Sequence, residues 1–304
     1  MGKLNRLGVT MKALVSILVS IVLGGLLTSV GSATPTHPRA SAPAGTIAFA
    51  GGRDGNPEIY LMTDTGRILR RLTRDPKYDA DPTWSPDGRR IAFYSQRTSS
   101  GEVFVVNADG TGLKNLTRNP AHDGGASWSP DGQSIVFDSD RASGAGIYVM
   151  RANGTGVRRL TTGGTDSDPA WSQDGSAIAF TSNRDGNDEI YIMKPDGSGQ
   201  TNITNAPGAE AQPAWSPDGR SLAFTSDRTG AKAVYVMDAQ GEHVRKLAAG
   251  DEPSWSSDGR SIAFTRETNP PDIWVVNAAG GGLRNITRSR FAEFTPAWAP
   301  AKRR

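Results

Sequence analysis

The chain has 304 residues, with 36 glycines, 19 prolines and no cysteine, which suits one large all-β domain with many tight turns and excludes disulfides and thiolate chemistry. Its formal charge of +3 comes from 34 bases and 31 acids, but seven of the bases lie in residues 1–45 and 302–304, which leaves 27 bases for a mildly acidic body. A basic surface for nucleic acid is therefore excluded.

The start of the chain predicts export. Three bases precede an uncharged apolar run over residues 13–31, which is the pattern of a signal peptide. We expect cleavage after Ala33, with a second candidate site after Ala42, so that 1–33 is the signal peptide and 34–45 a linker. The run also approaches the roughly 20 residues that span a bilayer, so an uncleaved anchor, and with it membrane association, is the alternative. Both interpretations place the protein in the periplasm or outside the cell.

The dominant pattern is an internal repeat of 40–44 residues, marked by Trp84, Trp128, Trp171, Trp215, Trp255 and Trp298. A Ser-x-Asp-Gly turn follows each of the first five tryptophans. Next come an apolar strand, such as residues 91–93, a second one, such as 190–193, and a short strand that usually ends in Leu-Thr or Ile-Thr. Such a unit has the length of a four-stranded propeller blade. Because these strands are apolar on both faces, neighbouring blades must cover both sides of each sheet.

The two ends of the repeat region complement each other. Residues 46–73 form a unit that lacks a tryptophan strand, and residues 296–299 form a tryptophan strand that begins no further unit. Together they make blade one, and blades two to six follow in chain order. We therefore predict an all-β fold, a six-bladed β-propeller of four-stranded antiparallel blades over 46–300, closed by the C-terminal strand and followed by a basic tail at 301–304.

The recurring pattern P-x-W-S-P-D-G…I-A-F-x-S-x-R…I-Y-V-M…D-G…L-T resembles the TolB-like propeller repeat over about residues 46–300. The resemblance implies a periplasmic protein-binding scaffold in envelope assembly, with a peptidoglycan-associated lipoprotein as partner, and we expect a monomer. The α/β domain that precedes the propeller in TolB proteins is not expected here, where a short linker follows the apolar run. Similar repeats also occur in prolyl oligopeptidase-like peptidases and polysaccharide lyases, so the repeat alone names no reaction.

The sequence gives little support for an enzyme. It has three histidines, His37, His122 and His243, which are far apart in the repeat, and it has no G-x-S-x-G nucleophile motif. We therefore expect no catalytic residue, no metal site and no cofactor. A carboxylate pair of the glycosidase kind stays open because acids are plentiful, so a glycan-binding or glycan-cleaving propeller is the alternative function.

Two residues recur on one face of blades one to five, an acid before the tryptophan strand and an arginine after the next strand. The pairs are Glu293 with Arg53, Asp79 with Arg97, Asp123 with Arg141, Asp166 with Arg184, and Glu210 with Arg228. Blade six has Gly250 and Thr268 instead, and this joint loss favours ion pairs within each blade that hold the loops. A ring of carboxylates that collects calcium at the channel mouth is the alternative.

Residues that depart from the repeat on this same face are the candidates for partner recognition. They are Tyr78, Asp81, His122, Asp168, Glu252, Phe291 and Phe294. For the two phenylalanines, packing beneath the closing strand is an equal alternative.

Overall fold

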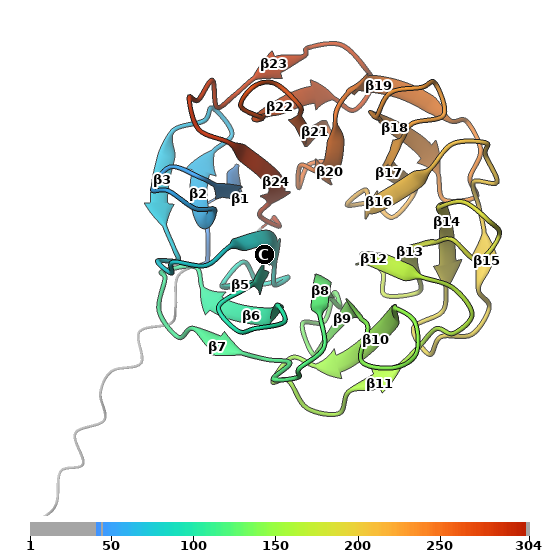
Figure 1. Cartoon of the computed structure of the whole chain (residues 1–304). Helices are drawn as coiled ribbons and strands as arrows, with labels where there is room; N and C mark the ends of the chain where they lie inside the picture. The colour runs from blue at the N-terminus through green and yellow to red at the C-terminus, as the bar shows by residue number, and fades with distance from the viewer. Residues whose placement is uncertain (1–40, 44, 302–304) are drawn as a thin grey trace, which may run out of the picture. The chain divides into compact units, whose positions relative to one another are not determined.

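The computed structural model describes residues 41–43 and 45–301, so the expected export signal lies outside the described residues. The described part of the chain forms 24 strands in six four-stranded antiparallel sheets, without any helix, arranged as a ring (Figure 1). The predicted six-bladed propeller is confirmed. Since these ranges hold no helix, none of their segments is a helix long and apolar enough to cross a membrane.

In each blade the strands are given from the channel outward. Blade one contains β24 (Glu293–Trp298), β1 (Thr46–Gly51), β2 (Glu58–Thr63) and β3 (Ile68–Arg71). Blade two contains β4 (Asp79–Trp84), β5 (Arg90–Ser95), β6 (Glu102–Asn107) and β7 (Lys114–Asn115). Blade three contains β8 (Asp123–Trp128), β9 (Ser134–Ser139), β10 (Gly146–Arg151) and β11 (Arg158–Arg159).

The remaining blades repeat this order. Blade four contains β12 (Asp166–Trp171), β13 (Ile178–Ser182), β14 (Glu189–Met193) and β15 (Thr201–Asn202). Blade five contains β16 (Glu210–Trp215), β17 (Ser221–Ser226), β18 (Ala233–Asp238) and β19 (Arg245–Ala249). Blade six contains β20 (Asp251–Trp255), β21 (Ser261–Arg266), β22 (Asp272–Asn277) and β23 (Arg284–Asn285).

The ring closes through the C-terminal strand. β24 pairs antiparallel with β1, with Ile47 opposite Trp298 and Gly51 opposite Glu293. The backbone N–H of Ala299 continues this pairing by donating to the Thr46 carbonyl at 2.8 Å. The inner edge of β1, the first strand in the chain, is therefore covered by the last one, which removes an exposed strand edge.

The core is divided among the six junctions between neighbouring blades. Each junction holds a separate cluster of buried apolar side chains. One phenylalanine of each second strand is completely buried: Phe49, Phe93, Phe137, Phe180, Phe224 and Phe264. The repeat tryptophans lie over the preceding blade, as when Trp84 Nε1 donates to the Ala297 carbonyl at 3.1 Å. The sheets are thus covered on both faces by their neighbours.

Every innermost strand is bulged at the same place. Three residues before the tryptophan the backbone takes a positive φ, between 50° and 56°, at Asp81, Gly125, Asp168, Gln212, Glu252 and Thr295. In five blades the next residue is proline, which cannot donate to the ladder, and the pairing register shifts across this point. The bulge places one residue of each blade at the channel.

Basic side chains link neighbouring blades on the outside of the ring. A lysine or arginine of the outermost strand donates to a backbone carbonyl in a turn of the next blade. For example, Lys114 Nζ donates to the Asn153 carbonyl at 2.8 Å. The equivalent donors are Arg70 to Asp109, Arg158 to Asp196, Arg245 to Ala278 and Arg284 to Asp64. In blade four this position is Thr201, which donates within its own turn to Gly199. Five of the six junctions therefore carry such a clasp.

Candidate site at the channel mouth

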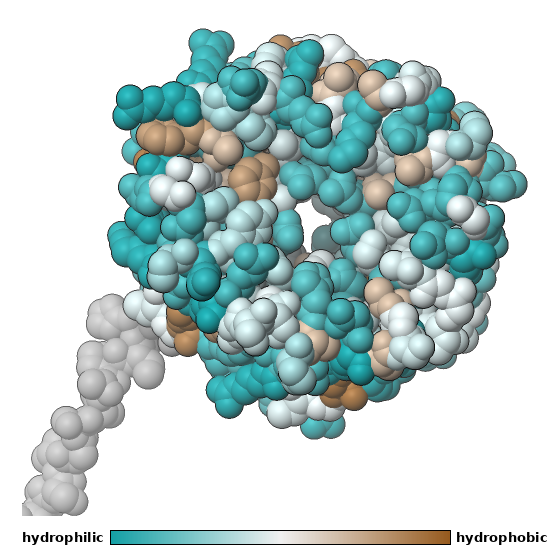
Figure 2. Space-filling view, in the orientation of Figure 1, coloured by the Kyte–Doolittle hydropathy of each residue, from teal (hydrophilic) through white to brown (hydrophobic). Residues whose placement is uncertain are grey.

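The two ends of the propeller differ in chemistry. We call the end with the loops before each innermost strand the loop face, and the end with the Ser-x-Asp-Gly turns the turn face. At the loop face the channel opens into a cavity of about 610 Å³. Figure 2 shows an opening at the centre of the ring with mainly hydrophilic residues around it.

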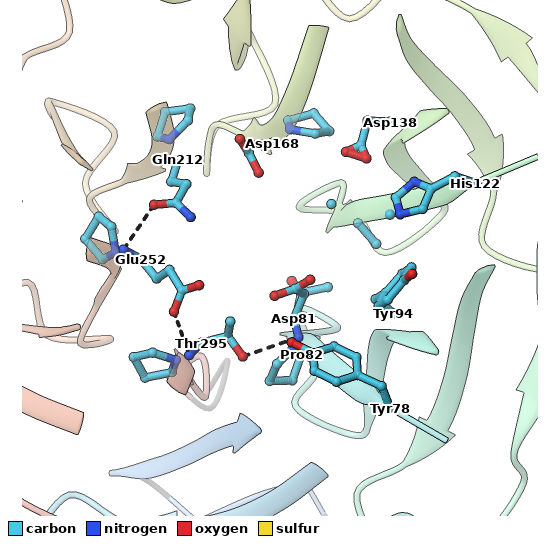
Figure 3. Close-up of a pocket in the computed structure, with 18 of the residues that line it drawn as sticks. Tyr78, Asp81, Pro82, Tyr94, His122, Asp138, Asp168, Gln212, Glu252 and Thr295 are labelled. Carbon is cyan, nitrogen blue, oxygen red and sulfur yellow. Dashed lines mark hydrogen bonds between the residues drawn. The ribbon is translucent and has the colours of Figure 1, made fainter. Parts of the chain in front are cut away.

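Four carboxylates line this cavity. Asp81, Asp168 and Glu252 occupy the bulges of blades two, four and six, and Asp138 comes from the second strand of blade three. Figure 3 shows their carboxyl groups turned toward the open space between the blades. The cavity lining contains no lysine or arginine among the described residues. Among the described lining residues these carboxylates therefore have no lysine or arginine partner, and His122 is the one histidine near them.

Hydrogen bonds around the channel connect successive blades. Glu252 Oε2 accepts the hydroxyl of Thr265 at 2.6 Å and the backbone N–H of Thr295, in the next blade, at 2.9 Å. The N–H of Gln212 donates to Thr181 Oγ1 in the preceding blade at 3.2 Å. Hydrogen bonds within a blade and between neighbouring blades thus fix the position of the channel residues.

Asp138 was not predicted as a site residue. Its position is held by Thr181, Thr225 and Thr265 in blades four, five and six, so it looked like one strand residue among others. In the structure its carboxylate faces the backbone N–H of Asp168, which favours the charged form of Asp138. A Cβ added to Gly125 would lie 2.7 Å from Asp138 Oδ1, so the glycine at this bulge makes room for the carboxylate. Aspartate at a position that is threonine in three other blades could have identified this residue from the sequence.

Surrounding protein and mutual repulsion raise the pKa values of the channel acids. Burial is the main cause at Asp138, with the charges of Asp168 and Asp81 adding to it, and raises the pKa to about 8. Burial and the charges of Glu252 and Asp168 raise the pKa of Asp81 to about 7. Asp81 is surrounded by protein, and its side chain is exposed to water in the channel. Protons or a cationic group would relieve this repulsion.

A row of aromatic rings lies along one side of the cavity. Phe294 stacks on Tyr78 with ring centres 6.1 Å apart, Tyr78 meets Tyr94 edge-on at 6.1 Å, and Tyr94 lies 5.2 Å from His122. These four residues belong to blades one, two and three. The row is next to Asp81 and Asp138 (Figure 3). It offers an aromatic surface beside carboxylates that no lysine or arginine of the described lining neutralises.

The structure therefore brings most of the sequence candidates together. Tyr78, Asp81, His122, Asp168 and Glu252 all line the cavity. Phe294 supports Tyr78 from behind, while Phe291 lies outside the lining, with the Arg290 guanidinium 5.0 Å from its ring centre. Tyr94 and Asp138 are lining residues that sequence reasoning missed.

The acids and arginines that recur in the repeat form ion pairs at the loop face. Arg97 Nη2 lies 2.5 Å from Asp79 Oδ2, and Arg141, Arg184 and Arg228 lie 2.7, 3.0 and 3.3 Å from Asp123, Asp166 and Glu210. Arg53 pairs with Glu293 in blade one. All five carboxylate side chains are fully buried. Each of these acids is held by its own arginine, while Asp79 Oδ1, Asp123 Oδ2 and Glu210 Oε2 accept no hydrogen bond from the described residues.

The Arg97 guanidinium is fixed from three sides. Its Nε donates to Ser95 Oγ at 2.7 Å, its Nη2 reaches Asp79, and its plane lies 4.9 Å from the ring centre of Phe104. Burial nevertheless raises the pKa of Asp79, and the nearby Glu58 of blade one adds to the effect. Glu58 is itself fully buried and was missed by sequence reasoning.

Blade six has Gly250 and Thr268 in place of the repeated acid and arginine, and it uses a different ion pair. Asp251, one residue later than the other acids, lies 3.4 Å from Lys232 of blade five. Arg266 places its guanidinium 4.7 Å from the ring centre of Trp274. The blade thus has an interblade ion pair to an exposed lysine instead of a pair to a half-buried arginine.

The opposite mouth of the channel is lined by tryptophans and prolines. All six repeat tryptophans border a cavity of about 410 Å³ at the turn face, together with Pro86, Pro130 and Pro217. No carboxylate belongs to the described lining of this mouth. The two mouths therefore differ in charge, since one is lined by acids and the described lining of the other is uncharged.

Comparison with known proteins identifies a family. The family model described as "TolB beta propeller domain" matches residues 28–111, 97–168 and 163–304. The "Tol-Pal system protein TolB" of Geobacter sulfurreducens is 44% identical over 45 residues, 15% of this chain and 10% of that protein. The "Uncharacterized peptidase YuxL" of Bacillus subtilis is 39% identical over 59 residues, 19% of this chain and 9% of that protein. The chain therefore spans about a tenth of the length of these curated relatives.

A solved structure supports the same grouping. The crystal structure of TolB from Acinetobacter baumannii superposes with a TM-score of 0.79 at 25% identity, over 84% of this chain and 67% of that one.

Proposed function

This chain belongs to the TolB beta propeller domain family, and on that premise we propose that it is an exported protein-binding propeller that captures a partner protein at its loop-face cavity. The observation that carries the proposal is the aromatic row beside carboxylates that no lysine or arginine of the lining neutralises. Aromatic side chains and buried polar groups at the centre of a surface are typical of binding hot spots.

The cavity specifies what a partner must present. The carboxylates of Asp81, Asp168 and Glu252 can only accept hydrogen bonds while they are ionised, so the partner supplies donors or a positive charge. The row from Phe294 to His122 suits an apolar or guanidinium plane packed against the rings. A partner segment with a basic residue next to an apolar one satisfies both requirements.

The envelope is the proposed setting. One relative is named as a Tol-Pal system protein, and the start of this chain has the charge pattern of an export signal. We propose a periplasmic or extracellular scaffold that acts as a monomer, with a peptidoglycan-associated lipoprotein as the first partner to test.

The test is a capture experiment with variants of the two faces. Purified peptidoglycan-associated lipoprotein is applied to immobilised protein that carries Tyr78→Ala with His122→Ala, Asp81→Asn with Asp168→Asn, or the turn-face control Gln173→Ala. We expect both loop-face variants to lose at least tenfold in affinity while the control binds normally, with unfolding midpoints measured for each. Loss of affinity in Gln173→Ala alone would place the binding site on the turn face and contradict the proposal.

A glycan-binding or glycan-cleaving role is the second candidate, because aromatic rings beside carboxylates also suit a sugar ring. It requires binding to glycans without any protein. Release of reducing ends from envelope polysaccharide that stops in Asp81→Asn would favour this role over protein capture. The absence of both binding and release with glycans would leave protein capture as the function.

A further inference from the structure

The turn between β18 and β19 in blade five departs from the corresponding turns of the other blades. In each blade the residue that starts this turn donates its N–H to the carbonyl four residues later, as Asn107 does to Thr111 and Asp238 does to Glu242. This shared bond aligns the turns residue by residue. The position of Glu242 is held by Thr111, Thr155, Ser198 and Gly281 in blades two, three, four and six. The position of His243 is held there by Gly112, Gly156, Gly199 and Gly282.

The departures in blade five bring three potential metal ligands together. One ligand atom each of Asp238, Glu242 and His243 lies within 4.8 Å of the others. His243 Nδ1 lies 2.7 Å from Asp238 Oδ2. Two residues that are small in blades two, three, four and six have thus become an acid and an imidazole that meet the aspartate at the start of the turn.

The backbone of the turn already orients the aspartate. Asp238 Oδ1 accepts the N–H groups of Gln240 at 3.1 Å and Glu242 at 2.7 Å. Its Oδ2 is left to face His243. Hydrogen bonds that fix one carboxylate oxygen in this way are the usual support of a metal-binding carboxylate.

The bases that follow the turn point to other partners. The guanidinium of Arg245 donates to the Ala278 carbonyl of blade six, and Lys246 Nζ lies 3.2 Å from Thr229 Oγ1. The side chain of His243 is 82% exposed, so an ion from solution reaches it directly. Two carboxylates and one imidazole are therefore available on an open surface.

We propose that Asp238, Glu242 and His243 bind a first-row divalent transition metal, with Zn²⁺ as the probe. One imidazole nitrogen with two carboxylate oxygens is a ligand set that zinc accepts, whereas calcium and magnesium prefer oxygen alone. On binding, the ion takes the place of the proton between His243 and Asp238: an imidazolium releases that proton to solvent, whereas a neutral imidazole keeps its one proton on the other ring nitrogen. Three protein ligands leave a fourth position for water or for a ligand from another molecule. The site lies on the turn face and is independent of the loop-face function.

The test measures zinc binding to the full chain by isothermal titration calorimetry at neutral pH, in a His37→Ala background that removes the histidine outside the described residues. His243→Gly restores the residue of four other blades. Its backbone is at φ 55°, where glycine is unstrained, so this variant should fold at least as well as the parent. We expect His243→Gly to weaken zinc binding at least tenfold and Glu242→Thr to weaken it severalfold, while His122→Ala has no effect.

The outcomes separate clearly. A loss of less than tenfold in His243→Gly, or no saturable zinc binding by the parent protein, overturns the assignment. Calcium that binds this turn as tightly as zinc overturns the choice of metal. The unfolding midpoint of His243→Gly is compared with that of the parent, both without metal. Equal midpoints mean that a loss of zinc binding does not come from a loss of folding.

Discussion

The carboxylate of Asp138 faces the backbone N–H of Asp168 in the next blade, which favours its charged form, at the place where threonine hydroxyls accept such an N–H in blades four, five and six. A carboxylate in blade three thus stands where three other blades have a neutral acceptor. The replacement adds a charge beside Asp168 and Asp81 without adding a base.

This arrangement predicts that acidification stabilises the protein between about pH 8 and pH 5. The pKa of Asp138 is raised to about 8 in the folded state, and an unfolded aspartate titrates near pH 3.9. The folded state therefore binds more protons in this window, and the free energy of unfolding rises as the pH falls. Asp138→Thr should reduce this slope and stabilise the protein at pH 8 by on the order of 1 kcal/mol, because channel water screens part of the repulsion. Urea unfolding at several pH values measures both effects, and an unchanged slope would contradict the assignment.

The buried ion pairs should be coupled more strongly than surface pairs. Arg97→Ala leaves the fully buried Asp79 without its base, which typically costs about 3–5 kcal/mol. A double-mutant cycle with Asp79→Ala should give a coupling energy of about 1–3 kcal/mol. The matched control is Lys232 with Asp251, where the lysine side chain is 59% exposed and coupling of about 0–1 kcal/mol is expected. Equal coupling in the two cycles would show that burial of Asp79 does not matter.

Removal of the closing strand should destabilise the whole ring. Deleting residues 293–304 uncovers the inner edge of β1 and opens blade one. Trp298→Ala alone should cost about 2–4 kcal/mol, somewhat less than for a fully buried aromatic side chain, because the indole is half-buried. The control deletes residues 302–304 only. A 293–304 deletion that unfolds at the same midpoint as this control would refute closure through β24.

The turn of blade four offers a stabilising substitution. Blades two, three and five have Pro86, Pro130 and Pro217 after the turn serine, whereas blade four has the exposed Gln173. Gln173→Pro should raise the free energy of unfolding by about 0.4–1 kcal/mol, because proline restricts the unfolded chain at a position whose conformation it can adopt. Gln173→Ala is the control and should have little effect. Destabilisation by proline would mean that this turn differs from the other three.

The sequence was sufficient for the fold because the fold is periodic. The tryptophan spacing, the Ser-x-Asp-Gly turns and the complementary ends predicted blade count, strand order and closure without any knowledge of contacts. Asp81, Asp168 and Glu252 were singled out as departures from the repeat, but their convergence depends on bulges that give them a positive φ. That conformation is unusual for residues other than glycine and is not read from residue type.

The residues that were missed have a common reason. Asp138 lies within a strand in a place that looked structural, and Glu58 is buried at the start of another strand beside an acid of the next blade. Both act across blade junctions. Comparing the repeats shows which residues occupy equivalent positions. It does not show which residue of the next blade lies beside each of them.

The lysine and arginine contacts between neighbouring blades on the outside are uneven, and we expect the ring to open first at the junction where the described residues provide none. Arginine or lysine spans five junctions on the outside, but Thr201 bonds only within its own turn, so blades four and five are joined there without such a side chain. Thermal fluctuations should widen this seam before the others, and amide hydrogens of β15 should exchange earlier than those of β7. A threaded polypeptide or an inserted domain would meet the least resistance between these two blades. The six junctions of the ring therefore differ in strength, although the blades themselves look nearly equivalent.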